Sequence, residues 1–145
     1  MVDYLLDTNV CIGLLKRHST ILAHIQTVGW ERLSLCAPVK AELWYGAFKS
    51  DRPQANLAVL RDLFITMPSL PFDDHAARHY GEIRAILARL GTPIGPNDLL
   101  IAAVVLAYRI TLITHNTREF SRIPGLQIED WQQQMPIDGT NQNHR

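Results

Sequence analysis

The sequence predicts an α/β domain in which a central parallel sheet is covered by helices. Short apolar runs with the character of β-strands recur along the chain, at Tyr4–Leu6, Leu33–Cys36, Ser69–Phe72 and Thr111–Thr114. The longer stretches between these runs have the spacing of helices. This alternation is typical of βαβ units, in which parallel strands form one sheet and the connecting helices pack on its faces.

The length and the composition indicate a single folded domain. The chain has 145 residues, of which 47% are hydrophobic and only 19% are charged, enough for a packed core. We expect the domain to span residues 1–134 and the polar segment 135–145 to be a disordered tail. Basic and acidic residues number 14 each. A broadly basic surface is therefore excluded, and any contact with nucleic acid must come from a local patch.

Cysteine usage and hydropathy bear on the compartment. Cys11 and Cys36 lie in apolar or helical patterns without CxxC spacing, which is typical of buried free thiols in a reducing environment. The first residues lack the basic segment of a signal peptide. The longest apolar run, Leu99 to Tyr108, is far shorter than the ~20 residues that span a bilayer. We therefore expect a cytoplasmic protein without a membrane segment.

Capping and turn residues predict where the helices begin and end. Thr8 is placed to cap the first helix and Asp74 to cap a long amphipathic one. Pro38 and Pro53 belong in the first turns of two others. The expected helices cover residues 8–17, 20–28, 38–49, 53–65 and 74–90, and the last of them stops at Gly91. Its expected buried face consists of Ala76, Tyr80, Ile83, Leu87 and Leu90.

Two aspartates stand where an α/β fold places functional groups. Asp7 directly follows the first strand, and ligands bind outside the carboxyl ends of parallel strands. The alternative is that Asp7 caps the following helix. Asp98 is the only charge between Leu90 and Arg109, and it opens a helix that is apolar on every side. We expect Asp98 to be buried, and a buried carboxylate needs a partner or a metal; the helix N-terminus is the alternative partner.

A third acid and a later polar segment complete the candidate site. Glu42 lies at the edge of an apolar helical stripe, one turn before Gly46, although a solvated helix acid has the same pattern. Three carboxylates suit Mg²⁺, which prefers oxygen ligands and keeps several waters. Beyond the fourth strand, Asn116 and Glu119 are weaker candidate ligands, and an ordinary Asn-containing turn is the alternative for this segment.

Five segments resemble the motifs of PIN-domain ribonucleases, and the last two are similar to VapC-type toxins in particular. They are Leu5-Leu6-Asp7-Thr8-Asn9, residues 41–46 around Glu42, residues 91–98 ending in Asp98, residues 114–120 and residues 123–131. The resemblance implies a PIN-like three-layer α/β/α sandwich with a central parallel sheet of four to five strands. It implies a toxin endoribonuclease that cleaves RNA, often tRNA, and inhibits translation. It also implies a homodimer and a VapB-like antitoxin as partners.

The resemblance carries expectations for individual residues. Asp7, Glu42 and Asp98 become the catalytic and metal-binding acids, with Mg²⁺ as the cofactor and Mn²⁺ as a substitute. Thr8, Asn9, Thr114 and Arg118 become contacts to the RNA. Many PIN domains have an acid in the fourth motif, where this chain has His115-Asn116. Either Asn116 is a neutral ligand or Glu119 replaces the acid, and the site holds one ion or two.

Other functions remain open from the residues alone. A metal-dependent phosphatase or phosphoacceptor domain also has an Asp after its first strand, but it normally has a second Asp nearby, where this chain has Thr8 and Asn9. A non-catalytic RNA- or protein-binding module would use the acids only as caps. His75, His79 and Glu82 superficially resemble a zinc site, yet no further ligand has a convincing spacing. The aromatic residues Trp44, Tyr45 and Phe48 are expected in the core or in a dimer interface.

Overall fold

Five parallel strands form one sheet in the computed structural model, which describes residues 1–133. The strands are β1 (Tyr4–Leu6), β2 (Leu33–Cys36), β3 (Ser69–Leu70), β4 (Thr111–Ile113) and β5 (Gln127–Glu129). Their order across the sheet is β3-β2-β1-β4-β5, and every neighbouring pair is parallel. The order places β1 at the centre. The expected tail, residues 135–145, lies outside the described part of the chain.

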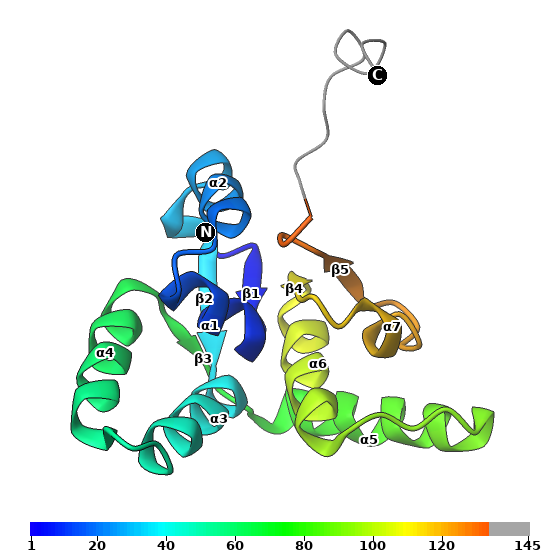
Figure 1. Ribbon diagram of the computed structural model, residues 1–145. Helices are drawn as coiled ribbons and strands as arrows, with labels where there is room; N and C mark the ends of the chain where they lie inside the picture. The colour runs from blue at the N-terminus through cyan, green and yellow to red at the C-terminus, as the bar shows by residue number, and fades with distance from the viewer. Residues whose placement is uncertain (134–145) are drawn as a thin grey trace, which may run out of the picture.

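Helices flank the sheet and complete the three-layer α/β/α fold (Figure 1). They are α1 (Thr8–Leu15), α2 (Ser19–Val28), α3 (Ala37–Phe48), α4 (Pro53–Thr66), α5 (Asp74–Leu90), α6 (Pro96–Tyr108) and the short α7 (Thr117–Phe120), with a 3-10 turn η1 (Trp30–Arg32) before β2. Helix α3 packs against α4, and α5 packs against α6. No helix within residues 1–133 is long and apolar enough to cross a membrane.

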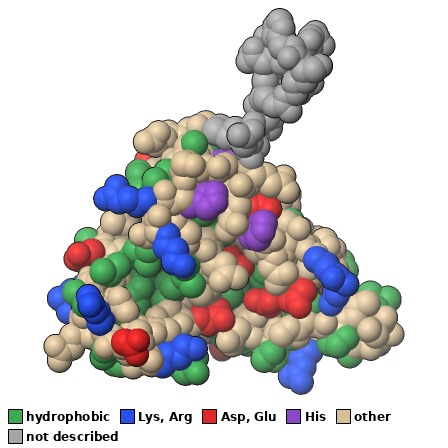
Figure 2. All heavy atoms as spheres, in the orientation of Figure 1, with side chains coloured by type: hydrophobic (Ala, Val, Ile, Leu, Met, Phe, Trp, Pro, Cys, Tyr) green, Lys and Arg blue, Asp and Glu red, His purple; other side chains and the backbone are tan. Residues whose placement is uncertain are grey.

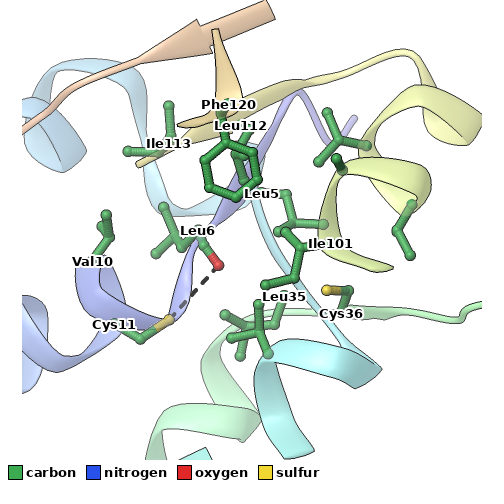
Figure 3. Close-up of a cluster of buried hydrophobic side chains, with 14 of the residues drawn as sticks. Leu5, Leu6, Val10, Cys11, Leu35, Cys36, Ile101, Leu112, Ile113 and Phe120 are labelled. Atoms are coloured by element: carbon green, nitrogen blue, oxygen red, sulfur yellow. Dashed lines mark hydrogen bonds between the residues drawn. The ribbon is translucent and has the colours of Figure 1, made fainter. Parts of the chain in front are cut away.

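Buried apolar side chains from the central strands and α6 form the core (Figure 3). Leu5, Leu6, Leu112 and Ile113 from the two middle strands are fully buried, and Ile101 of α6 packs with them. The expectation of an internal α6 is therefore confirmed. Strands buried on both faces are typical of parallel sheets, which explains why these runs are apolar throughout and do not alternate.

Both cysteines are free and buried, as the sequence indicates. Burial raises the pKa of the Cys36 thiol to about 12 and raises that of Cys11 further. A thiol reacts through its thiolate, so neither side chain is suited to nucleophilic chemistry at neutral pH.

The structure corrects several element boundaries. The side chain of Asp7, and not that of Thr8, caps α1, and Asp73 rather than Asp74 caps α5 by accepting a hydrogen bond from the Ala76 amide at 3.0 Å. Strand β3 ends at Leu70, before the expected end at Phe72, and β4 ends at Ile113. Strand β5 was not expected, because an edge strand with two exposed polar residues carries little apolar signal.

Side-chain exposure corrects two further expectations. Leu90, placed on the buried face of α5, is 63% exposed because it is the last residue of that helix. The aromatic residues of α3 are not in the core, since Trp44 is 43% and Tyr45 and Phe48 are each 66% exposed. Interface packing is the part of that expectation that remains.

Candidate active site

The site lies at the carboxyl edge of the sheet. Leu6 of β1 aligns with Ile113 of β4, and Ile113 aligns with Glu129 of β5. The next residues of the three strands continue the pairing, because the Asp7 amide donates to the Ile113 carbonyl at 2.9 Å and the Thr114 amide donates to the Glu129 carbonyl at 3.0 Å. Asp7, Thr114 and Asp130 therefore form the first row beyond the strands, where α/β folds bind their ligands.

Asp7 is the most deeply buried acid of the site, with 5% of the residue exposed. One carboxylate oxygen accepts from the Thr8 amide at 2.8 Å, and the other accepts from the Thr114 hydroxyl at 2.8 Å. Burial raises the pKa of Asp7, these two hydrogen bonds oppose the rise, and the charge of Glu42 adds to it. Asp7 thus caps α1 and also presents a carboxylate at the site, so the two interpretations are compatible.

Glu42 projects from α3 toward the same edge. Its carboxylate accepts from the Thr8 hydroxyl at 2.6 Å and from the Asn97 side-chain amide at 3.3 Å. Thr8 thereby connects two acids, since its amide binds Asp7 and its hydroxyl binds Glu42. The side chain is only partly buried.

Asp98 lies in the first turn of α6, and it is only half-buried. The expectation of a fully buried carboxylate is wrong, because the apolar part of α6 begins one residue later, at Leu99. Burial nevertheless raises the pKa of Asp98 to about 7, with further contributions from a hydrogen bond to Glu119 and from the charges of Asp7, Glu119 and Glu42. Every other acid of the site therefore contributes to the raised pKa of Asp98.

Asn116 and Glu119 come from the segment after β4. The Asn116 side-chain amide donates to Glu119 at 3.1 Å and to Asp98 at 3.4 Å. The interaction with Asp98, followed by the hydrogen bond from Asn116, lowers the pKa of Glu119. The backbone amide of Asn116 also donates to the Thr114 hydroxyl at 2.9 Å, so Thr114 joins this segment to Asp7.

The four carboxylates thus gather in one acidic site, defined here as Asp7, Glu42, Asp98 and Glu119. Several acidic side chains cluster in the middle of one face of the molecule, with basic side chains distributed around them (Figure 2). Among the described residues, no Lys or Arg forms an ion pair with any of the four. Nor do residues 1–133 contain a preformed group of three or more His, Cys, Asp or Glu placed to hold a metal. The side chains of Thr8, Asn97 and Asn116 lie between the carboxylates, so the acids occur at one edge of the sheet without forming a ready ligand triad.

The remaining candidates lie at the rim. Asn9 and Arg118 are exposed. The positive charges of Arg118 and Arg122 act on Glu119. Sequence reasoning missed the pairing of His115 with Asp130, whose Nδ1 and Oδ2 atoms are 3.0 Å apart. Asp130 follows β5 as Asp7 follows β1, and recognition of that edge strand would have singled it out.

A parallel α/β fold with an acidic site at the carboxyl edge of its sheet defines a class of domains, and a family model gives the class its name. The PIN domain model matches residues 4–126. That range includes all four acids, strand β1 that precedes Asp7, and the strands β2 and β4 on either side of β1.

Similar proteins narrow the class. The chain is 41% identical to a tRNA(fMet)-specific endonuclease VapC of Salmonella typhimurium over 90% of this chain and 99% of that protein. It is 35% identical to Ribonuclease VapC2 of Haemophilus influenzae, with the same coverage. A crystal structure of DNA-bound VapBC from Salmonella typhimurium superimposes with a TM-score of 0.85 at 42% identity, covering 90% of this chain and 99% of that one. The chain belongs to the PIN-domain family and, within it, to the VapC ribonucleases.

Proposed function

We propose that this chain is a metal-dependent endoribonuclease that acts as the toxin of a toxin–antitoxin pair. The catalytic residues in this proposal are Asp7, Glu42 and Asp98. The observation that carries it is the position of these carboxylates at one sheet edge, where no basic side chain of residues 1–133 forms an ion pair with them. The names of the relatives support RNA as the substrate, and the Salmonella typhimurium endonuclease supports tRNA in particular. Cleavage of tRNA would inhibit translation.

The donor set fits a hard divalent cation. Uncompensated carboxylates in partial burial are unfavourable, as the raised pKa values of Asp7 and Asp98 indicate. A cation removes that penalty. Mg²⁺ needs only one or two carboxylates when it keeps waters and gains a substrate phosphate, so a preformed triad is not required. Asp7 and Asp98 are the ligands in this proposal, with Glu42 beside them and Asn116 or Glu119 completing the set.

Each side chain has a separable task in the cleavage of a phosphodiester. When bound, Mg²⁺ or its substitute Mn²⁺ supplies charge neutralisation and activation of water. Asp7 is held in place by Thr8 and Thr114, so its orientation does not depend on the substrate. Glu42 is positioned by the Thr8 hydroxyl to accept a proton at the reacting edge. Asn9 and Arg118, both exposed beside the site, contact the RNA.

Sequencing of RNA ends tests the activity and identifies the target together. Brief expression of the wild type is expected to produce new 5′ ends at one or a few tRNA positions, and Asp7→Asn is expected to produce none. Purified protein should reproduce the cuts with Mg²⁺ or Mn²⁺ and lose them with EDTA. Cuts by Asp7→Asn at the wild-type rate would refute the catalytic assignment.

An antitoxin partner has a plausible surface next to the site. A groove between α1, α3 and α4 is lined by apolar residues that include Ile12, Leu15, Leu43 and Val59, and Glu42 lies on its wall. A VapB-like chain lying in this groove would cover exposed apolar surface and obstruct the acids at once. The structural relatives include VapBC complexes from Salmonella typhimurium and Rickettsia felis. Val59→Asp is expected to weaken neutralisation by the antitoxin without reducing RNA cleavage; unchanged neutralisation would exclude the groove.

A homodimer is the second assembly in the proposal. Tyr45 and Phe48 are each 66% exposed and lie about one turn apart on α3, and aromatic residues are enriched at protein–protein interfaces. Light scattering of the purified toxin is expected to give twice the chain mass, and Phe48→Glu should shift it toward the monomer. A monomeric wild type at micromolar concentration would contradict the dimer.

A further inference from the structure

The carboxyl edge of the sheet carries a second polar pair that the proposed cleavage does not use. Asp130 follows β5, and His115 follows Thr114 at the end of β4. The His115 Nδ1 atom is 3.0 Å from the Asp130 Oδ2 atom. Within residues 1–133, neither side chain forms a hydrogen bond with any of the four acids.

The pair is asymmetric in its exposure. The Asp130 side chain is 8% exposed, whereas that of His115 is 60% exposed. The other oxygen of Asp130 accepts from the Gln132 amide at 2.9 Å, and the neighbouring Trp131 is buried with 1% exposure. The carboxylate is therefore held by the Gln132 backbone amide and lies next to the buried Trp131, whereas the imidazole extends from it into solvent.

The hydrogen bond determines which ring nitrogen faces outward. A carboxylate can only accept, so Nδ1 carries the hydrogen and the free atom is Nε2 on the opposite side of the ring. A pair whose histidine is this exposed contributes little to stability, whereas burying a carboxylate is unfavourable. Stability alone therefore does not account for the arrangement. What it provides is an imidazole of defined orientation with one nitrogen available to a ligand.

The position of the pair suggests the ligand. Asp7, Thr114 and Asp130 occupy one row, and adjacent strands lie about 4.8 Å apart, so the Asp130 backbone is about 10 Å from that of Asp7. His115 stands between Thr114 and Asn116, which both belong to the hydrogen-bond network of the acids. A nucleic-acid strand that has a phosphate at the acids and runs along this edge of the sheet brings a neighbouring nucleotide within reach of His115.

We propose that His115 binds the ribose-phosphate backbone of a nucleotide adjacent to the scissile bond, and that Asp130 is its positioning residue. The inference rests on the proposed nuclease activity and adds a contact that selects the path of the RNA strand. Through Nε2, the imidazole can accept from a 2′-hydroxyl or, with both nitrogens protonated, donate to a phosphate oxygen. Both groups belong to the same backbone.

Steady-state cleavage of a short RNA containing the cut site gives the first test. His115→Ala is expected to raise KM about tenfold, the equivalent of one lost hydrogen bond to a ligand, with kcat little changed. His75→Ala is the matched control, because it removes an exposed histidine on α5 that has no place in the site. Thermal melts of both variants should match the wild type. Equal KM values for His115→Ala and wild type would overturn the inference.

Modified substrates locate the contact. RNAs with a single 2′-deoxy or a single methylphosphonate substitution are compared at each position flanking the cut. Wild type is expected to lose affinity at one flanking position in one of the two series, and His115→Ala should show no further loss at that position. A structural role for His115 predicts the same loss in both proteins at every position, which would refute the contact.

Asp130→Asn tests the positioning role. The asparagine oxygen can still accept from the Gln132 amide, but its NH₂ group then faces Nδ1 and forces the hydrogen onto Nε2. For a contact to a 2′-hydroxyl, the expected result is a KM increase similar to that of His115→Ala, with no additional increase in the double variant. For a contact to a phosphate oxygen, Nε2 remains a donor, so KM is expected to change little. Independent effects that multiply in the double variant would overturn the link. The nuclease activity is tested separately, by comparing cleavage by the wild type with the loss of cleavage expected in Asp7→Asn. Failure of this inference is therefore distinguishable from failure of the proposed function.

Discussion

The two sides of the acidic site are held in different ways. At the end of β1, Asp7 is buried and each of its oxygens accepts a hydrogen bond of 2.8 Å from a neighbour in the fold. On the other side, Asp98 in the first turn of α6 is half-buried and Glu119 lies in α7, and the side-chain amide of Asn116 donates to both carboxyls at longer distances of 3.4 and 3.1 Å.

In the proposed metal site, this difference corresponds to one preorganised ligand and several adjustable ones. We call Asp7 the rigid side and the pair of Asp98 and Glu119 the adjustable side. Mg²⁺ requires nearly ideal octahedral geometry, and a set of rigid carboxylates without a cation would carry the full repulsion. Asp7 supplies the reference position. The raised pKa of Asp98 allows this carboxyl to hold a proton, which reduces the repulsion and which a metal can displace.

The largest expected effect comes from the rigid side. Asp7→Asn should reduce RNA cleavage by more than about a hundredfold, since even outer-shell partners of a metal are worth roughly 10–100-fold. Asparagine keeps the cap of α1, so metal-free stability should hold or rise. Asp73→Asn is the matched control, because Asp73 caps α5 away from the site. Initial rates on the sequenced tRNA target and urea melts measure both. A stability loss with retained cleavage would reduce Asp7 to a cap.

Thr114→Val should have the next largest effect. The variant keeps the shape of the side chain but removes the hydroxyl, which donates to Asp7 and accepts from the backbone amide of Asn116. An unsatisfied buried carboxylate oxygen should lower the free energy of unfolding by about 1–3 kcal/mol. Thr8→Val, whose hydroxyl binds the more exposed Glu42, should lower it less, since water can replace that donor. Equal losses of the free energy of unfolding in urea at pH 7 would contradict the conclusion that the buried position of Asp7 makes its hydrogen bond from Thr114 the more important of the two.

The dependence on pH tests the adjustable side. The folded state raises the pKa of Asp98 from 3.8 to about 7, so in this pH range the folded protein holds a proton that the unfolded chain has released. Metal-free stability should therefore fall as pH rises between these values and level off above about 7. The raised pKa of Asp7 acts in the same direction. The lowered pKa of Glu119 matters only below its usual value of 4.5.

Asp98→Asn should flatten that fall and abolish cleavage as Asp7→Asn does. In the wild type, Mg²⁺ should raise the melting temperature more at pH 8 than at pH 5.5, because it must displace the proton at the lower pH. Melts of both proteins with Mg²⁺ and with EDTA give the comparison. A stabilisation by Mg²⁺ that is the same at both pH values would argue against Asp98 as the proton-bearing ligand.

The smallest effects are expected from changes at Asn116 and Glu119, the two candidates for the remaining ligand of the proposed metal site. Asn116→Ala leaves all carboxylates in place, so its effect on cleavage should be milder than that of either aspartate variant. Glu119→Gln tests whether this acid fills the position directly. A loss as large as that of Asp98→Asn identifies Glu119 as a ligand, and a small loss leaves Asn116 or water in that role. Mg²⁺ titrations of cleavage rates separate weaker metal binding from slower chemistry.

Local sequence was sufficient for the parts of this protein that depend on neighbours along the chain. The bounds of β1 and β2 were predicted correctly, because a short buried strand is a continuous apolar run. The helices over residues 19–28, 37–48, 53–66 and 74–90 followed from proline, glycine and periodic apolar positions, within one or two residues. The three principal acids of the proposed site were selected because each stands at the end of an element or at the edge of an apolar stripe.

Tertiary structure decided what connects segments that are distant in sequence. Thr114 binds Asp7 across 107 positions, and Thr8 binds Glu42 across 34, because the sheet order brings β4 beside β1 and α3 over the same edge. The half-burial of Asp98 depends on where α6 emerges from the core, which the apolarity of the helix does not specify. The pairing of His115 with Asp130 required β5 to lie beside β4. Propensity and periodicity act over a few residues, whereas strand order depends on how the whole core packs, and only the assembled sheet determines which polar groups meet at its edge.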